Sequence, residues 1–192
     1  MNNCFESIES YKEFISKIDQ LTEEIKQEYS SEINCKESCC ACCNNIFNVS
    51  IVEGIYLQEG FKKLDYEIQE TIIQNLHSIK KSIEEKPDSK EFIHCPLLLN
   101  KRCSLYTYRP IICRTFGYPM VDELTGQIAT CELNFPDLRE EKQTIKTISS
   151  KLISANTALL SKFYLSEIGK NFDDDYIPDL YSILEIILSE TG

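Results

Sequence analysis

Hydrophobic side chains recur along much of the chain at steps of three and four, the period of an amphipathic α-helix. A first helix is predicted over residues 5–29, with these apolar positions on one face: Phe5, Ile8, Ile15, Ile18, Leu21 and Ile25. A second stripe covers residues 64–83: Leu64, Ile68, Ile72, Leu76, Ile79 and Ile83. Because Pro87 follows this stripe, we expect its helix to end near residues 84–86.

A shorter helix is predicted from its start and stop signals. Ser50 is followed three residues later by Glu53, the spacing of a capping box, and Gly60 is expected to end the helix. Glu53 could instead be an acid close to a metal, but the capping spacing alone accounts for it.

The C-terminal third returns to helical spacing. Residues 138–169 predict a helix with one apolar face and with Gly169 as its C-terminal cap; the face comprises Ile145, Ile148, Leu152, Leu159 and Phe163. A last helix is expected from about Pro178, with Leu180, Leu184, Ile187 and Leu188 apolar. The acidic residues 173–175 before it suit a helix start better than a calcium loop, whose fixed spacing is missing.

Residues 92–136 lose the helical period, and proline and glycine interrupt them repeatedly. Short apolar pieces at residues 97–99 and 111–112 are read as brief strands or turns. We therefore predict a mainly α fold, a single domain over residues 1–192. In it, helices at residues 5–30 and 137–190 flank and enclose an irregular, cysteine-rich metal-binding segment at residues 35–131.

The charge and the N-terminus limit the classes of partner. With 31 acidic and 20 basic residues the chain carries a net charge of −11, which argues against binding nucleic acid or anionic membranes. The first residues lack the basic and apolar regions of a signal peptide, and no apolar run reaches the about 18 residues that span a bilayer. We expect a cytoplasmic protein, and leave a protein partner open.

Cysteine is the residue that points to chemistry. The chain has 10 cysteines, and five of them fall within residues 35–43. In a reducing compartment such clusters are more often metal ligands than disulfides, and adjacent cysteines pair poorly with each other. We expect the neighbours Cys42 and Cys43 to point different ways, which favours two metals or a polynuclear site over one ion.

Two motifs carry a family resemblance. The first is Cys35-x3-Cys39-x2-Cys42-Cys43; the second runs Cys95-Pro-x-Leu, then Cys103-x2-Tyr106-x2-Arg109-Pro110-x2-Cys113-Arg114. Together they resemble the cysteine-cluster family named for its CxxCxxCC signature, also called YkgJ-like and distantly related to flagellin lysine N-methylases. The x3 gap after Cys35 and the additional Cys40 depart from the family pattern.

The resemblance implies a zinc- or iron-chelating domain over about half of the chain. Counting the candidates gives these metal ligands: Cys35, Cys39, Cys42, Cys43, Cys95, Cys103, Cys113 and Cys131. Cys4 and Cys40 are placed outside the set, and His94 could replace a thiolate. Arg109 and Arg114 are expected to support the site by offsetting thiolate charge and donating hydrogen bonds to sulfur, with a surface ion pair as the alternative.

The sequence leaves the role of the metal open. Iron, as an iron–sulfur cluster or a polynuclear site, is slightly favoured over zinc, in a redox or structural role. An enzyme using the metal, such as a flagellin lysine N-methylase-like protein, and a metal storage or delivery protein are the alternatives. No HExxH, P-loop or G-x-G-x-x-G motif is present in the sequence, so the usual zinc-hydrolase and nucleotide-binding signatures are missing.

Overall fold

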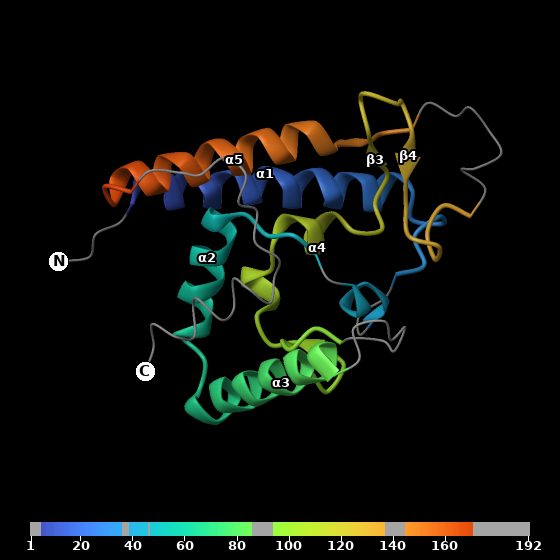
Figure 1. Ribbon diagram of the computed structural model, residues 1–192. Coiled ribbons are helices and arrows are strands. Elements are labelled where there is room, and N and C mark those ends of the chain that lie inside the picture. The colour runs from blue at the N-terminus through green and yellow to red at the C-terminus, as the bar shows by residue number, and fades with distance from the viewer. Residues whose placement is uncertain (1–4, 36–38, 46, 86–93, 137–144, 171–192) are drawn as a thin grey trace. The chain divides into compact units, whose positions relative to one another are not determined.

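The computed structural model describes residues 5–35, 39–45, 47–85, 94–136 and 145–170 (Figure 1). The described chain falls into two compact units. Unit 1 comprises residues 5–35, 111–136 and 145–170, and unit 2 comprises residues 39–45, 47–85 and 94–110.

Unit 1 is built on two helices, α1 (Glu6–Glu28) and α5 (Ser150–Glu167), which lie side by side and antiparallel (Figure 1). Glu167, at the end of α5, accepts a hydrogen bond from the backbone N–H of Glu6 at 2.8 Å. It also accepts from the backbone N–H and the hydroxyl of Ser7. The first N–H groups of a helix have no partner within it, so a carboxylate from another helix caps α1.

The start and the exposed face of α5 differ from the sequence expectation. The helix begins at Ser150, and Ile148 lies in a buried strand before it. The apolar face was predicted wrongly, because Leu152, Leu159 and Phe163 are exposed. The buried face carries Thr157 and Ser161, whose hydroxyls donate to backbone carbonyls one turn earlier. Small side chains that satisfy their own polar groups can be buried at low cost.

Short elements complete unit 1. A helix of one turn, α4, spans Ile111–Thr115. Three two-residue strands, β3 (Met120–Val121), β4 (Ile128–Ala129) and β5 (Ile148–Ser149), form a small sheet in which β3 is central, antiparallel to β4 and parallel to β5. Beside this sheet, Ile25, Phe135 and Ile148 form a buried apolar cluster.

Unit 2 contains the two helices predicted between residues 50 and 85, α2 (Ile51–Phe61) and α3 (Tyr66–Glu85). The predicted capping box is confirmed, because the backbone N–H of Ser50 donates to the Glu53 carboxylate at 2.8 Å. The prediction that Gly60 ends α2 is wrong, since the helix continues to Phe61. Gly60 is needed for another reason: it lies against the ring of Tyr108.

A β-hairpin and two short 3₁₀ turns make up the rest of unit 2. Strands β1 (Leu98–Leu99) and β2 (Arg102–Cys103) are joined by Asn100 and Lys101, which have φ values of 50° and 61°. Two consecutive residues with positive φ suit the type I′ turn, whose twist matches a hairpin. The 3₁₀ turns are η1 (Ala41–Asn44) and η2 (Tyr106–Tyr108).

The predicted mainly α class is confirmed, with the addition of two small sheets. Helices α1 and α3 occupy the ranges expected from their periodicity. Gly169 has the positive φ of a C-terminal cap, and α5 ends two residues before it. The last predicted helix, the acidic residues before it and Cys4 lie outside the described residues. Enclosure of the cysteine segment by helices, and the single-domain organisation, stay predictions.

No helix in the described part of the chain is both long enough and apolar enough to cross a membrane.

Candidate metal centre

Unit 2 brings together the two cysteine-bearing segments that the motifs predicted. Cys42 and Cys43 lie on the 3₁₀ turn η1, and Cys95 and Cys103 lie at the base of the β1–β2 hairpin. The backbone N–H of Cys95 donates to the carbonyl of Cys43 at 2.7 Å, which fastens the turn to the hairpin. A second backbone bond, from Leu98 to the carbonyl of Cys95 at 3.0 Å, fixes the approach to the hairpin.

The thiols of Cys42 and Cys43 lie together. A hydrogen bond joins the two side chains, which contradicts the expectation that adjacent cysteines point apart. The reason lies in the local backbone: alternate side chains point to opposite sides of a strand, whereas successive residues on a 3₁₀ turn are related by one third of a turn. The tight turn therefore brings the two sulfur atoms within reach of each other.

The electrostatics link these four cysteines. The hydrogen bond from Cys43 and burial raise the pKa of the Cys42 thiol. Burial raises the pKa of Cys95 to about 12, and the charges of Cys103 and Cys42 add to the shift. Burial also raises the pKa of Cys103, with Cys42 contributing. Cys42 thus interacts with three other thiols, and the pKa values of Cys42, Cys95 and Cys103 are all raised.

Arg109 is the positive charge that acts on this group. Its charge opposes the effect of burial and lowers the pKa of Cys103. The guanidinium is held by a 2.7 Å hydrogen bond to the carbonyl of Tyr106 and lies 3.8 Å from the centre of the Tyr106 ring. The charge of Arg109 thus acts on Cys103, and Tyr106 keeps the guanidinium in place; support of a metal site by Arg109 stays a prediction.

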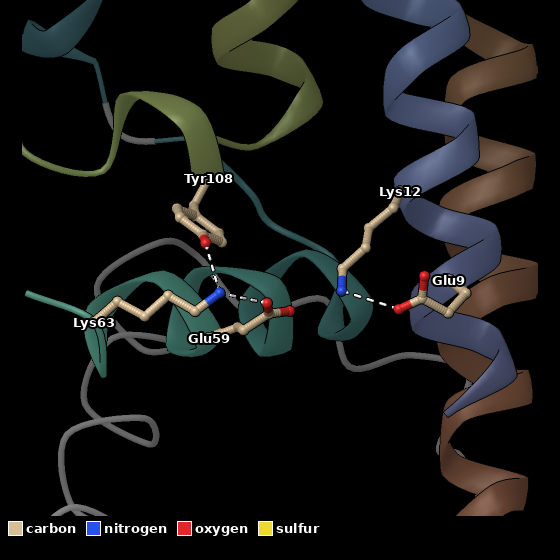
Figure 2. A network of polar contacts seen from close by, with 5 residues as sticks. All are labelled: Glu9, Lys12, Glu59, Lys63 and Tyr108. Carbon is tan, nitrogen blue, oxygen red and sulfur yellow. Dashed lines mark hydrogen bonds and ion pairs between the residues drawn. The ribbon is translucent and has the colours of Figure 1, made fainter. Parts of the chain in front are cut away.

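The turn that carries Arg109 is itself anchored to α2. The hydroxyl of Tyr108 accepts a hydrogen bond from Lys63 at 2.8 Å, and Lys63 also pairs with Glu59 at 2.8 Å (Figure 2). These interactions raise the pKa of Lys63, the bond to Glu59 contributing most. The ring of Tyr108 also packs on Tyr56, with centroids 4.9 Å apart. Tyr108, the residue immediately before Arg109, is thus fixed by its contacts with α2.

Other candidate groups in unit 2 lie beside the same turn. Cys39 and Cys40 are half-buried, and the carbonyl of Cys40 accepts from the backbone N–H of Cys43 at 3.0 Å. His94 Nδ1 lies 2.6 Å from the side-chain oxygen of Asn44. The role of Cys39 as a ligand stays a prediction.

Unit 1 holds the remaining predicted cysteines. Cys35 is exposed, whereas Cys113, on α4, and Cys131 are half-buried. Arg114 is buried and forms an ion pair with Asp19 of α1 at 2.6 Å. A surface ion pair was the alternative role expected of Arg114 from the sequence. The structure shows an ion pair, but the guanidinium is buried.

Sequence reasoning missed Asn134, a buried residue whose side chain bonds to the backbone of Asn34, Cys35 and Gly117. An asparagine between Leu133 and Phe135 carries no local signal, because its partners are 17, 99 and 100 residues away.

Among the described residues, no three His, Cys, Asp or Glu side chains are already arranged to hold a metal ion. The donor set nevertheless fits a soft metal, since Cys42 interacts with the three other thiols of unit 2 and the charge of Arg109 acts on Cys103.

Comparison with known proteins gives one match. The model of the family described as "CxxCxxCC: Putative zinc- or iron-chelating domain" matches residues 34–132, a range that includes all eight predicted cysteine ligands. No curated protein and no solved structure matches the chain.

Proposed function

The chain belongs to the CxxCxxCC family, and we propose that Cys42, Cys43, Cys95 and Cys103 chelate one metal ion in unit 2. The observation that carries the proposal is the 2.7 Å backbone hydrogen bond from Cys95 to the carbonyl of Cys43, which joins the turn to the hairpin. The influence of Cys42 on the pKa values of Cys95 and Cys103 supports it. Two of the thiols come from a tight turn and two from the base of a hairpin, an arrangement that suits four-coordinate structural sites.

Zinc is the ion we propose. The main sequence argument for a polynuclear iron site was that Cys42 and Cys43 would point apart, and their hydrogen bond removes it. Four thiolates around one ion favour tetrahedral zinc, or iron in the same coordination. Because four protein ligands leave no open position, this site would have a structural role and not a catalytic one.

The metal would complete the core of unit 2. Cys95 and Cys103 pack on the buried cluster formed by Val49, Leu57, Phe61, Ile72, Leu76, Leu97 and Leu105. An ion bound there ties the turn η1 to this core, so the binding free energy contributes to folding. Four thiolates and one divalent cation leave two negative charges, which Arg109 would partly offset.

The first test is elemental analysis with an absorption spectrum on protein purified without oxygen. We expect colourless protein with zinc, and a Cys42→Ser variant that contains less zinc because the site in unit 2 is lost. Cys40→Ser is the matched control, because Cys40 lies in the same turn region outside the proposed set. Coloured protein with iron and acid-labile sulfide would replace the zinc assignment by an iron–sulfur cluster. Equal metal content in both variants would refute the ligand set.

The second test separates a structural site from a delivery site. A closed four-thiolate site within a packed unit should release zinc slowly to a competing chelator, and unfolding should accelerate the release. Rapid release from the folded protein would favour storage or delivery of the metal.

A further inference from the structure

The side chain of Asn134 joins three segments of unit 1. Its exposed fraction is 3%. The oxygen Oδ1 accepts hydrogen bonds from the backbone N–H groups of Asn34 and Cys35, each at 3.0 Å. The nitrogen Nδ2 donates to the carbonyl of Gly117 at 2.8 Å, and the backbone N–H of Asn134 donates to the carbonyl of Cys131 at 3.0 Å.

The geometry requires a carboxamide at this position. One side-chain atom must accept two hydrogen bonds while its neighbour donates one, which Asn can do and an ionised Asp cannot. The segment facing it is matched to this side chain: Gly117 has a φ of 96°, and a Cβ atom there would lie 2.8 Å from Asn134 Nδ2. A glycine is therefore needed at residue 117 for the carboxamide to approach.

The segments that meet at Asn134 carry cysteines. Cys35 donates its own backbone N–H to the carboxamide, and Cys131 closes the turn that begins at its carbonyl and ends at Asn134. The Cβ atom of Cys131 lies 3.4 Å from the position that a Cβ of Gly117 would take. Cys113 lies in α4, four residues before Gly117 in the sequence.

We infer that Asn134 is a positioning residue, which holds Cys35 and Cys131 on one loop cluster as thiolate ligands for a metal ion. The inference rests on the proposed function, because it extends thiolate chelation to unit 1. Residues that fix the backbone and orientation of metal ligands govern affinity without touching the metal. Asn134 acts in this way through the backbone N–H of Cys35 and the carbonyl of Cys131.

The test is a double-mutant cycle read by cobalt. Co²⁺ bound to thiolates gives a near-ultraviolet absorption whose intensity follows the number of thiolates bound. Asn134→Asp keeps the size of the side chain and removes the donor to Gly117. We expect it to weaken Co²⁺ binding about 10- to 100-fold at these thiols, and to reduce the absorption to that of a Cys35→Ser/Cys131→Ser chain.

The cycle distinguishes a positioning role from a merely structural one. In the Cys35→Ser/Cys131→Ser background, Asn134→Asp should cause no further loss of absorption. An equal further loss there would show that Asn134 only supports the fold, and would overturn the inference. Asn156→Asp is the matched control, since Asn156 Nδ2 donates to the carbonyl of Leu152 at 2.8 Å within α5 of the same unit.

A measurement on the unaltered chain covers the case in which Asn134→Asp does not fold. Zinc added to isotope-labelled, metal-free protein should shift the NMR signals of the Asn134 side-chain amide and the Cys35 backbone amide, and leave the Asn156 side-chain amide in place. If the signals of Asn134 and Cys35 do not move, while Cys42→Ser still abolishes part of the cobalt absorption, the role of Asn134 is refuted but the proposed function is not. A wild-type chain without thiolate–cobalt absorption would refute the proposed function as well.

Discussion

Replacing Gly60 by alanine should destabilise unit 2, although alanine is the better helix former. Gly60 lies within α2, and an added Cβ would stand 2.3, 2.5 and 2.9 Å from the Cγ, Cδ2 and Cβ atoms of Tyr108. Carbon atoms in contact prefer about 3.5–4.0 Å, so the ring must move by about 1 Å or more. Such a shift also strains the 2.8 Å bond from Lys63 to the Tyr108 hydroxyl (Figure 2).

The magnitude follows from two opposing effects. Overpacking a well-filled site costs about 1–3 kcal/mol. Alanine in place of glycine inside a helix returns up to about 1 kcal/mol. We therefore expect Gly60→Ala to lower the free energy of unfolding by about 1–2 kcal/mol, measured by urea denaturation of the metal-free protein.

The control repeats the same substitution in a chain that lacks the Tyr108 ring. In a Tyr108→Ala background the added methyl group meets only the Cβ atom of residue 108, at 2.9 Å, so Gly60→Ala should cost clearly less than in the native sequence. If Gly60→Ala lowers stability equally in both backgrounds, or not at all in the native sequence, the close approach of α2 to Tyr108 does not determine the choice of glycine.

Two further changes test other features. Because burial raises the pKa of Cys95 from 9.0 to about 12, the unfolded chain loses this proton at lower pH than the folded one. Metal-free protein should therefore keep its stability below about pH 9 and lose it as the pH rises toward 12, by at most about 1.4 kcal/mol per pH unit for this group. Urea denaturation at several pH values should show a shallower decline for Cys95→Ala, and identical slopes would contradict the shift. Removing the carboxylate that caps α1, by Glu167→Ala, should cost about 1 kcal/mol in thermal unfolding. Glu9→Ala, which removes an exposed acid of α1, should stay within about 0.5 kcal/mol, and equal losses would refute the capping role.

Local periodicity predicted the helices whose apolar stripe faces a core. The stripe of α3 contributes Ile72 and Leu76 to the buried cluster of unit 2, and α1 buries Ile15, Ile18 and Ile25. It failed for α5, where Thr157 and Ser161 are buried and Leu159 is exposed. A hydroxyl that bonds to its own helix carries no polar penalty into the interior, and a hydrophobicity pattern cannot register that internal bond.

The motifs predict a set of cysteine ligands, but they did not reveal how the fold divides these cysteines between two units. Cys35 belongs to unit 1 and Cys42 to unit 2, although only seven positions separate them in the sequence. The orientation of Cys42 and Cys43 depends on a 3₁₀ turn that the sequence run did not reveal. Asn134 was missed because its role depends on partners brought near by the fold, and no spacing rule connects residues 99 positions apart.

The carboxylate cap on α1 bears on the order in which the chain can fold as it is synthesised. Glu167 is 161 residues from Glu6, so the first turn of α1 can be capped only after α5 has been synthesised. In the sequence, the described part of unit 2 comes after residue 35 and before residue 111, between two stretches of unit 1. Once residue 110 has been synthesised, all the described segments of unit 2 are present, whereas unit 1 still lacks α4 and α5. The described part of unit 1 is thus completed only after the described part of unit 2 has been synthesised.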